Sequence, residues 1–175
     1  MERLSMNWCA KWIWIKQRNY AAYNQTILAC KMFTLGELEA ATIRITADST
    51  YRLFINDQWV NDGPGRSWPE HFKYDEIDVS SYLRQGDNEI RVIANCFGAG
   101  VMTRYTVQAG LLVQLDAVDC DGKATTIASD QTWLVARLEQ AQSSRNWLDF
   151  GDTTVARLVN AEGDGLPGLT VDRYG

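Results

Sequence analysis

Short segments of alternating apolar and polar residues run through most of this chain. The alternation is strict in residues 42–47, and residues 89–97 follow it except at Ile93 and Phe97. Successive side chains of a strand point to opposite faces of a sheet, so each segment predicts a strand with one buried face. The residues on the apolar faces are Ile43 and Ile45 in the first segment and Ile90, Val92 and Ala94 in the second. Further strands are predicted at Tyr51–Ile55, Gln58–Val60, Phe72–Val79, Gly110–Val118 and Thr132–Leu138.

Turn-forming residues separate these segments. Asn56 and Asp57 lie between two predicted strands and indicate a hairpin. Asn61–Gly65 has the composition of a loop, and Ser80–Gly86 predicts one helical turn that serine caps and glycine ends. No segment shows a long helical period. The chain is therefore predicted to be all-β, an antiparallel β-sandwich of the jelly-roll type.

The composition changes near the C-terminus. Residues 140–146 are polar and linker-like, and Val155–Val159 and Leu169–Tyr174 predict two strands around a tight turn. The second strand has barely begun when the chain ends at Gly175, and an unpaired terminal strand is an unfavourable end for a domain. We therefore expect a sandwich domain at residues 1–150 and a truncated tail at residues 151–175.

Composition and charge narrow the classes of function. The 175 residues are 46% hydrophobic and 22% charged, which is typical of a soluble globular chain of about one domain. Acidic residues outnumber basic ones by 22 to 17, which argues against sequence-independent binding of nucleic acid. The sequence contains neither an apolar run of about 20 residues nor a signal-peptide pattern at its start, so we expect no membrane partner and a cytoplasmic location.

The four cysteines are Cys9, Cys30, Cys96 and Cys120, and they lie far apart in the sequence. They form no C-x-x-C pair and have no histidine nearby, which argues against a zinc site. Their apolar neighbours favour reduced, buried thiols, while a disulfide remains the alternative.

Motifs for nucleophilic catalysis and for nucleotide binding are missing. The single histidine, His71, lies in a polar segment beside Glu70. The favoured interpretation is an exposed histidine without a catalytic role. No serine has the G-x-S-x-G pattern, and no phosphate-binding glycine loop occurs. We therefore expect no catalytic residue in this chain.

Three carboxylates lie close together on one predicted strand: Asp75, Glu76 and Asp78. Glu76 and Asp78 share a face by alternation, with Cα atoms about 6.6 Å apart. The simplest interpretation is a solvated face. A calcium ion held by Glu76 and Asp78 is the second, and the carboxylate pair of a retaining glycosidase is the third.

Aromatic and polar residues gather around the predicted hairpin and the loop that follows it. Sugars present flat C–H faces and many hydroxyls, so their sites combine an aromatic platform with hydrogen-bonding side chains. The candidate ligand-binding residues are Asn56, Asp57, Trp59, Asp62, Arg66 and Trp68. The equally weighted alternative is that both tryptophans cover the edge of the sandwich and that Arg66 pairs with a structural carboxylate.

Three further tryptophans lie near the start of the chain: Trp8, Trp12 and Trp14. Trp12 and Trp14 share a strand face, which favours a place in the core or in a contact between domains. A second hypothesis is an exposed patch that drives association with another domain.

Eight segments in order resemble the N-terminal β-sandwich domain of bacterial α-L-rhamnosidases, over about residues 7–150. They are Lys11–Trp14, Ile45–Asp48, Tyr51–Asn56, Gly63–Arg66, Tyr74–Val79, Leu83–Asn88, Ala109–Leu112 and Ser129–Trp133. The resemblance implies a galactose-binding-like jelly roll, an accessory domain that precedes a catalytic (α/α) barrel. Some such domains bind sugar with calcium. Asp57 stands where the family usually has glycine, so this chain departs from the family pattern at that turn.

The tail resembles a different family. Residues 157–175 are similar to a segment of bacterial ribosomal-RNA large-subunit cytosine methyltransferases, which lies upstream of their S-adenosylmethionine domain. None of the cofactor-binding or catalytic motifs follows, so we expect no methyltransferase activity. Our hypothesis is a fusion of two fragments, joined near residues 148–157.

These observations leave three readings of the function. The first is a non-catalytic domain that binds rhamnose-containing glycans, with calcium as an optional cofactor. The second is a structural domain that packs on a catalytic barrel, and the third is a fragment of an S-adenosylmethionine-dependent RNA methyltransferase.

Overall fold

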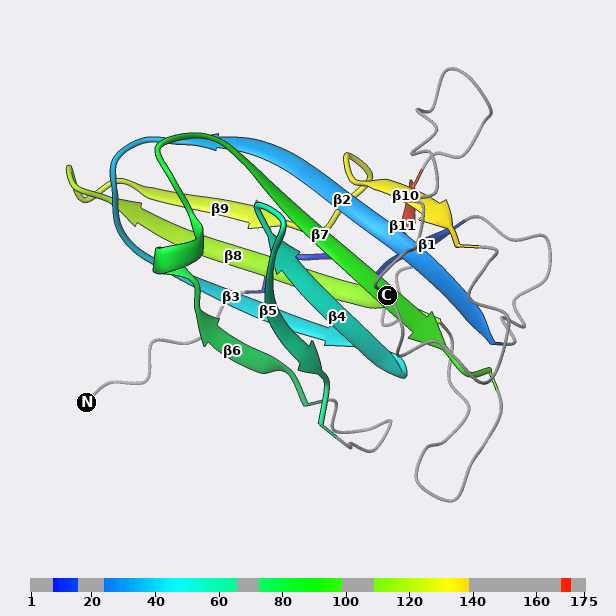
Figure 1. Cartoon of the computed structure of the whole chain (residues 1–175). Coiled ribbons are helices and arrows are strands. Elements are labelled where there is room, and N and C mark those ends of the chain that lie inside the picture. The colour runs from blue at the N-terminus through cyan, green and yellow to red at the C-terminus, as the bar shows by residue number, and fades with distance from the viewer. Residues whose placement is uncertain (1–7, 16–23, 66–72, 99–108, 139–167, 171–175) are drawn as a thin grey trace.

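The chain folds into two antiparallel β-sheets that face each other (Figure 1). The computed structural model describes residues 8–15, 24–65, 73–98, 109–138 and 168–170. Sheet A contains β1 (Ile13–Ile15), β3 (Leu38–Ala47), β6 (Asp75–Asp78), β8 (Leu111–Asp119), β9 (Ala124–Ala128) and β11 (Gly168–Thr170). Sheet B contains β2 (Gln25–Leu35), β4 (Thr50–Ile55), β5 (Gln58–Gly63), β7 (Gly86–Cys96) and β10 (Leu134–Arg137).

Strands that are distant in sequence lie side by side in both sheets. Sheet A has the order β11-β1-β8-β3-β6, with β9 also paired to β8, and sheet B has the order β10-β2-β7-β4-β5. Most consecutive strands lie in opposite sheets, for example β2, β3 and β4, so the chain crosses repeatedly from one sheet to the other, as in a jelly roll. The predicted fold class, an all-β antiparallel sandwich, is confirmed.

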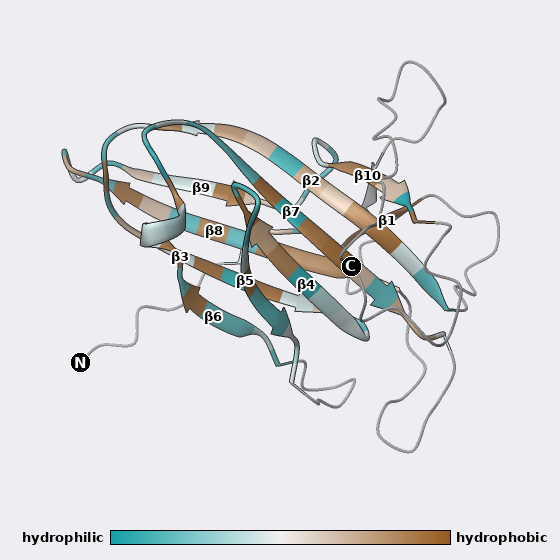
Figure 2. Cartoon of the chain, in the orientation of Figure 1, coloured by the Kyte–Doolittle hydropathy of each residue, from teal (hydrophilic) through white to brown (hydrophobic). Residues whose placement is uncertain are grey.

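The inner faces of the two sheets form the core. Ile43 and Ile45 of β3 are fully buried, and so are Ile90, Val92 and Ala94 of β7, as the alternation predicts. Figure 2 shows hydrophobic and hydrophilic residues alternating along several strands. Trp14 and Trp133 are the largest side chains that are almost completely buried. Within the described residues, no helix is long and apolar enough to cross a membrane.

Two strands were not predicted. The first is β2, whose first six residues, Gln25–Cys30, are all buried. That half of the strand therefore shows no alternation of apolar and polar residues. Such two-sided burial removes the period of two on which strand prediction depends. The short strand β9 consists of small and β-branched residues, ATTIA, and gives an equally weak signal.

Two local predictions need correction. Asn61, Asp62 and Gly63 belong to β5, so the predicted loop begins only at Pro64. Ser80–Tyr82 forms a short 3₁₀ helix, but the serine does not cap it. Instead, the carboxylate of Asp78 accepts hydrogen bonds from the backbone N–H of Ser80 at 3.0 Å and from its hydroxyl at 2.7 Å.

The favoured interpretation, which places Trp12 and Trp14 in the core, is confirmed, and the second hypothesis of an exposed patch is wrong for both. Trp12 and Trp14 are 8% and 1% exposed, because β1 lies inside sheet A between β8 and β11. The ring of Trp8 packs edge-on against Tyr74, with centroids 5.3 Å apart. The tail is also not unpaired where it is described, since Gly168–Thr170 pairs with β1.

All four cysteines are free, as the favoured interpretation predicts. Cys30 and Cys96 are buried, but Cys9 and Cys120 are exposed. The prediction of burial is wrong for these two, because Cys9 precedes β1 and Cys120 lies in the turn between β8 and β9. Cys120 is also flanked by Asp119 and Asp121, so its sequence neighbours are not apolar as the prediction assumed.

Candidate functional site

A β-bulge in β5 brings Trp59 and Asp62 to the same face of sheet B. Phe54 pairs with Trp59 and Leu53 pairs with Asn61, so Val60 is the extra residue. Residues three apart in a regular strand point to opposite faces, and an added residue reverses that relation. Val60 consequently packs into the core at 8% exposure, while Trp59 stays on the outer face.

Trp59 has an exposed indole ring beside a fixed carboxylate. Its side chain is 56% exposed, and its Nε1 donates a hydrogen bond to Asp62 at 3.3 Å. Arg52 donates to the two oxygens of Asp62 from Nε at 2.8 Å and from Nη2 at 3.0 Å. These hydrogen bonds, led by that from Arg52, lower the pKa of Asp62 and keep it ionised.

A second group of charged side chains lies next to this pair. Arg91 of β7 stands opposite Phe54 of β4, and Phe54 stands opposite Trp59. The Nη2 atom of Arg91 contacts the carboxylates of Glu89 at 2.5 Å and Asp57 at 2.9 Å. We call the surface formed by Arg52, Phe54, Asp57, Trp59, Asp62, Glu89 and Arg91 the Trp59 platform.

Asn56 holds the hairpin turn in place and is fully engaged within the protein. Its Nδ2 donates to the carbonyl of Tyr82 at 2.9 Å and to Oδ1 of Asn88 at 2.8 Å. Its own Oδ1 accepts the backbone N–H of Glu89 at 3.0 Å. Asn56 therefore positions the turn beneath the platform, whereas Asp57 reaches the surface with a side chain that is 79% exposed.

The structure brings together three of the predicted ligand residues: Asp57, Trp59 and Asp62. The other predicted ligands Arg66 and Trp68, and also His71, lie outside the described residues. Sequence reasoning missed Arg52, Phe54, Glu89 and Arg91. Counting outward from the turn would pair Arg52 with Asn61, and only the bulge moves its partner to Asp62.

The edges of the two sheets meet close to the platform. The hydroxyl of Tyr51 in β4 donates to Asp75 of β6 at 2.5 Å and accepts a hydrogen bond from Asn61 of β5 at 2.9 Å. Burial and the Asp75 carboxylate raise the pKa of Tyr51 far above its usual value. A Cβ atom at Gly63 would lie only 2.8 Å from Tyr51, so only glycine fits beside this link.

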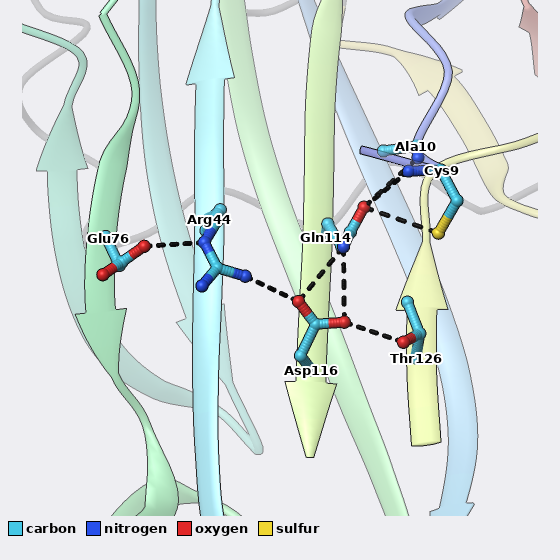
Figure 3. A network of polar contacts seen from close by, with 7 residues as sticks. All are labelled: Cys9, Ala10, Arg44, Glu76, Gln114, Asp116 and Thr126. Atoms are coloured by element: carbon cyan, nitrogen blue, oxygen red, sulfur yellow. Dashed lines mark hydrogen bonds and ion pairs between the residues drawn. The ribbon is translucent and has the colours of Figure 1, made fainter. Parts of the chain in front are cut away.

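The predicted metal ligands Glu76 and Asp78 lie on the outer face of sheet A, on the same side of β6, as predicted. Glu76 accepts a hydrogen bond from Arg44 at 2.6 Å, and Arg44 also contacts Asp116 at 2.6 Å. Figure 3 shows this network crossing β6, β3, β8 and β9 and ending at Thr126. In the part of the chain that the structure describes, no three acidic, cysteine or histidine side chains are grouped so as to hold a metal ion. Calcium binding at Glu76 and Asp78 stays a prediction.

The network also fastens the start of the chain to sheet A. Gln114 donates to both oxygens of Asp116, at 3.3 and 3.1 Å, and its Oε1 accepts the backbone N–H of Cys9 at 2.9 Å. The acidic side chains of this network are thus committed to hydrogen bonds across the sheet, which gives them a structural role.

Comparison with known proteins gives matches to both of the families that the sequence resembles. A family model described as alpha-L-rhamnosidase N-terminal domain matches residues 36–153. The solved structure of a GH78 family rhamnosidase of Bacillus sp. GL1 is 34% identical, with a TM-score of 0.69. That similarity covers 77% of this chain but only 14% of the rhamnosidase.

Two further matches are more limited. A lectin from Pleurotus ostreatus, solved in complex with GalNAc, has a TM-score of 0.59 at 22% identity over 74% of this chain and 35% of the lectin, which shows a shared fold alone. Ribosomal RNA large subunit methyltransferase I of Aliivibrio fischeri is 52% identical over 48 residues, which is 27% of this chain and 12% of that enzyme. A match this short does not bring the activity of the methyltransferase to this chain.

Proposed function

Because the chain belongs to the family of alpha-L-rhamnosidase N-terminal domains, we propose that it binds carbohydrate at the Trp59 platform as an accessory domain of an α-L-rhamnosidase-like hydrolase. The observation that carries this proposal is the exposed indole of Trp59 beside the paired side chains of Arg52 and Asp62. The domain itself is non-catalytic. It holds glycan near a catalytic domain that carries out the hydrolysis.

The platform has the two elements that a sugar requires. The C–H face of a pyranose ring stacks on the indole of Trp59, and ring hydroxyls donate to the exposed carboxylate of Asp62. Arg52 fixes that carboxylate through two hydrogen bonds before any ligand arrives, which lowers the entropy lost on binding. With so few polar contacts we expect a binding free energy of about −4 to −6 kcal/mol, which corresponds to a Kd from tens of micromolar to about 1 mM.

The wider assembly forms a second part of the proposal. This chain spans 14% of the Bacillus rhamnosidase, so the rest of such a hydrolase would supply the barrel that cleaves the glycosidic bond. Rhamnose-containing glycans are the ligand class that the family name suggests. A calcium ion at Glu76 and Asp78 would lie on sheet A, away from the Trp59 platform, and is a separate element of the proposal.

Isothermal titration of the purified chain with L-rhamnose and a panel of plant oligosaccharides tests the platform. We expect saturable binding by the wild type and loss of at least tenfold in affinity for Trp59→Ala, because the stacking surface is removed. The matched control is Met32→Ala. Met32 lies in β2 of the same sheet and is 59% exposed, and two strands separate β2 from β5, which carries Trp59. It stands opposite Glu89, on the side of β7 that faces away from β4 and β5.

The outcomes separate the readings clearly. Equal loss in both variants, or unchanged binding by Trp59→Ala, would remove the platform from the proposal. Absence of binding to every sugar would leave a structural domain that packs on the hydrolase. Titration in calcium and in EDTA then tests the carboxylates: calcium dependence that Glu76→Gln abolishes supports the ion, and identical affinities exclude its role in sugar binding.

A further inference from the structure

Both guanidinium groups of the Trp59 platform are already held by carboxylates. Arg52 is bound to both oxygens of Asp62, at 2.8 and 3.0 Å. Arg91 lies between Glu89 at 2.5 Å and Asp57 at 2.9 Å. Among the described residues of the platform, three carboxylates therefore surround two guanidiniums, and one net negative charge remains.

This charge balance has consequences for a ligand. A hydroxyl can donate to the exposed oxygens of Asp57 and Asp62 without disturbing either ion pair. A ligand carboxylate has no proton to donate, so it would have to displace a protein carboxylate from Arg52 or Arg91. The displaced group would lose its charge-assisted hydrogen bonds, and the remaining net charge would repel the ligand.

We propose that the Trp59 platform selects neutral sugars and discriminates against sugars that carry a carboxylate, such as uronic acids. This inference rests on the proposed function, since it concerns the same surface. The net charge of −5 on the whole chain acts in the same direction, because it lowers the local concentration of anionic glycans.

Pairs of sugars that differ at one group, a hydroxymethyl in the neutral member and a carboxylate in the acidic one, test the inference. The first pair is L-rhamnosyl-glucose and L-rhamnosyl-glucuronic acid, and the second is methyl β-D-galactoside and methyl β-D-galacturonide. We expect the neutral member to bind at least about fivefold more tightly at low ionic strength. The ratio should fall towards one in 0.5 M NaCl, where charges separated by more than about 4 Å are screened.

The binding signal is read at Trp59 itself. A ¹H–¹⁵N spectrum contains its indole N–H, which Trp59→Phe identifies by the loss of one peak. Glu89→Gln removes one of the three platform carboxylates while keeping its shape, and we expect it to reduce the ratio about twofold. Glu39→Gln makes the same change in net charge at an exposed position on sheet A and should leave the ratio unchanged.

Each result decides between two conclusions. Equal or tighter binding of the acidic member in either pair overturns charge selection while it supports the proposed function. An equal change of the ratio in Glu89→Gln and Glu39→Gln overturns the role of the platform carboxylates. If no sugar perturbs the Trp59 peak, the proposed function fails, and the inference fails with it.

Discussion

The thiol of Cys30 lies next to a carboxylate on a crowded part of sheet B. It donates to Glu89 at 2.9 Å and is 2% exposed. Burial, followed by the hydrogen bond to Glu89 and the charge of Glu89, raises the pKa of Cys30 to about 12. Cys30 stands opposite Arg91 in the sheet, and Glu89 contacts both the thiol of Cys30 and the guanidinium of Arg91.

This shift predicts a loss of stability at alkaline pH. The pKa is higher in the folded chain than the 9.0 of a free thiol, so the stabilisation is complete below pH 9 and declines as the pH rises towards 12. We expect Cys30 to account for a loss of about 1 kcal/mol in the free energy of unfolding between pH 9 and pH 10.

Urea titrations of the wild type and of Cys30→Ala, under reducing conditions at pH 7, 9 and 10, measure this loss. The difference at pH 7 contains the effect of the smaller side chain, so only the change with pH is compared. The stability of the variant should fall less steeply with pH than that of the wild type. Parallel curves would show that the thiol has no raised pKa.

At the scale of single elements, the β4–β5 turn contains two residues that share a backbone conformation but differ in how much their side chains stabilise the turn. Asn56 and Asp57 both have positive φ, 49° and 64°, as a two-residue hairpin with a type I′ turn demands. Asn56 makes three hydrogen bonds with its side chain, whereas Asp57 makes an ion pair at an exposed position.

Glycine substitutions in this turn should therefore have opposite effects. We expect Asp57→Gly to stabilise the chain by about 0.5 kcal/mol, because glycine adopts positive φ without strain and an exposed ion pair contributes little. Asn56→Gly should cost about 2 kcal/mol, since Asn88 and the N–H of Glu89 lose their partner. Thermal unfolding of both variants gives the comparison, and a similar change in Tm for the two would contradict this account.

The same hairpin shows how far the sequence predicts the structure. Alternation and the Asn-Asp turn predicted β4 and the return of the chain through Trp59, but they left open whether Trp59 is exposed for a ligand or covers the edge of the sandwich. The bulge at Val60 was not predictable, because no residue type marks it and it reflects the competing demands of Val60 for the core and Asp62 for Arg52. Partners such as Glu89 and Arg91 come from a strand that is adjacent only in the folded sheet.

At the scale of the whole molecule, the sandwich begins before the segment that the family model matches. The match starts at residue 36, but β1 and β2 precede it. Strand β2 lies between β10 and β7 and pairs with β7 along all eleven of its residues. Buried side chains such as Ile27 and Ala29 belong to the common core.

A chain that starts at residue 36 should consequently fail to fold. Its loss of β2 would leave β10 without a partner in sheet B and β7 paired with β4 alone, and it would expose the inner face of sheet A. We expect the shorter chain to unfold in urea with a broad, non-cooperative transition. We also expect its NMR spectrum to lose the dispersed signals of a folded sheet. A chain that starts at residue 8 retains every described strand and serves as the control. Cooperative unfolding of the shorter chain would show that β2 is dispensable.

The extra residue in β5 also bears on how relatives of this domain are compared. Here the aromatic and acidic residues are separated by two positions, W-x-x-D, and share a face only because one of those positions bulges. A relative with a regular strand would present the same pair of side chains from W-x-D. An alignment would register this as a one-residue gap and a lost motif, although the surface is preserved. Searches for the platform in other genomes should therefore accept both spacings, provided that an arginine occupies the facing strand.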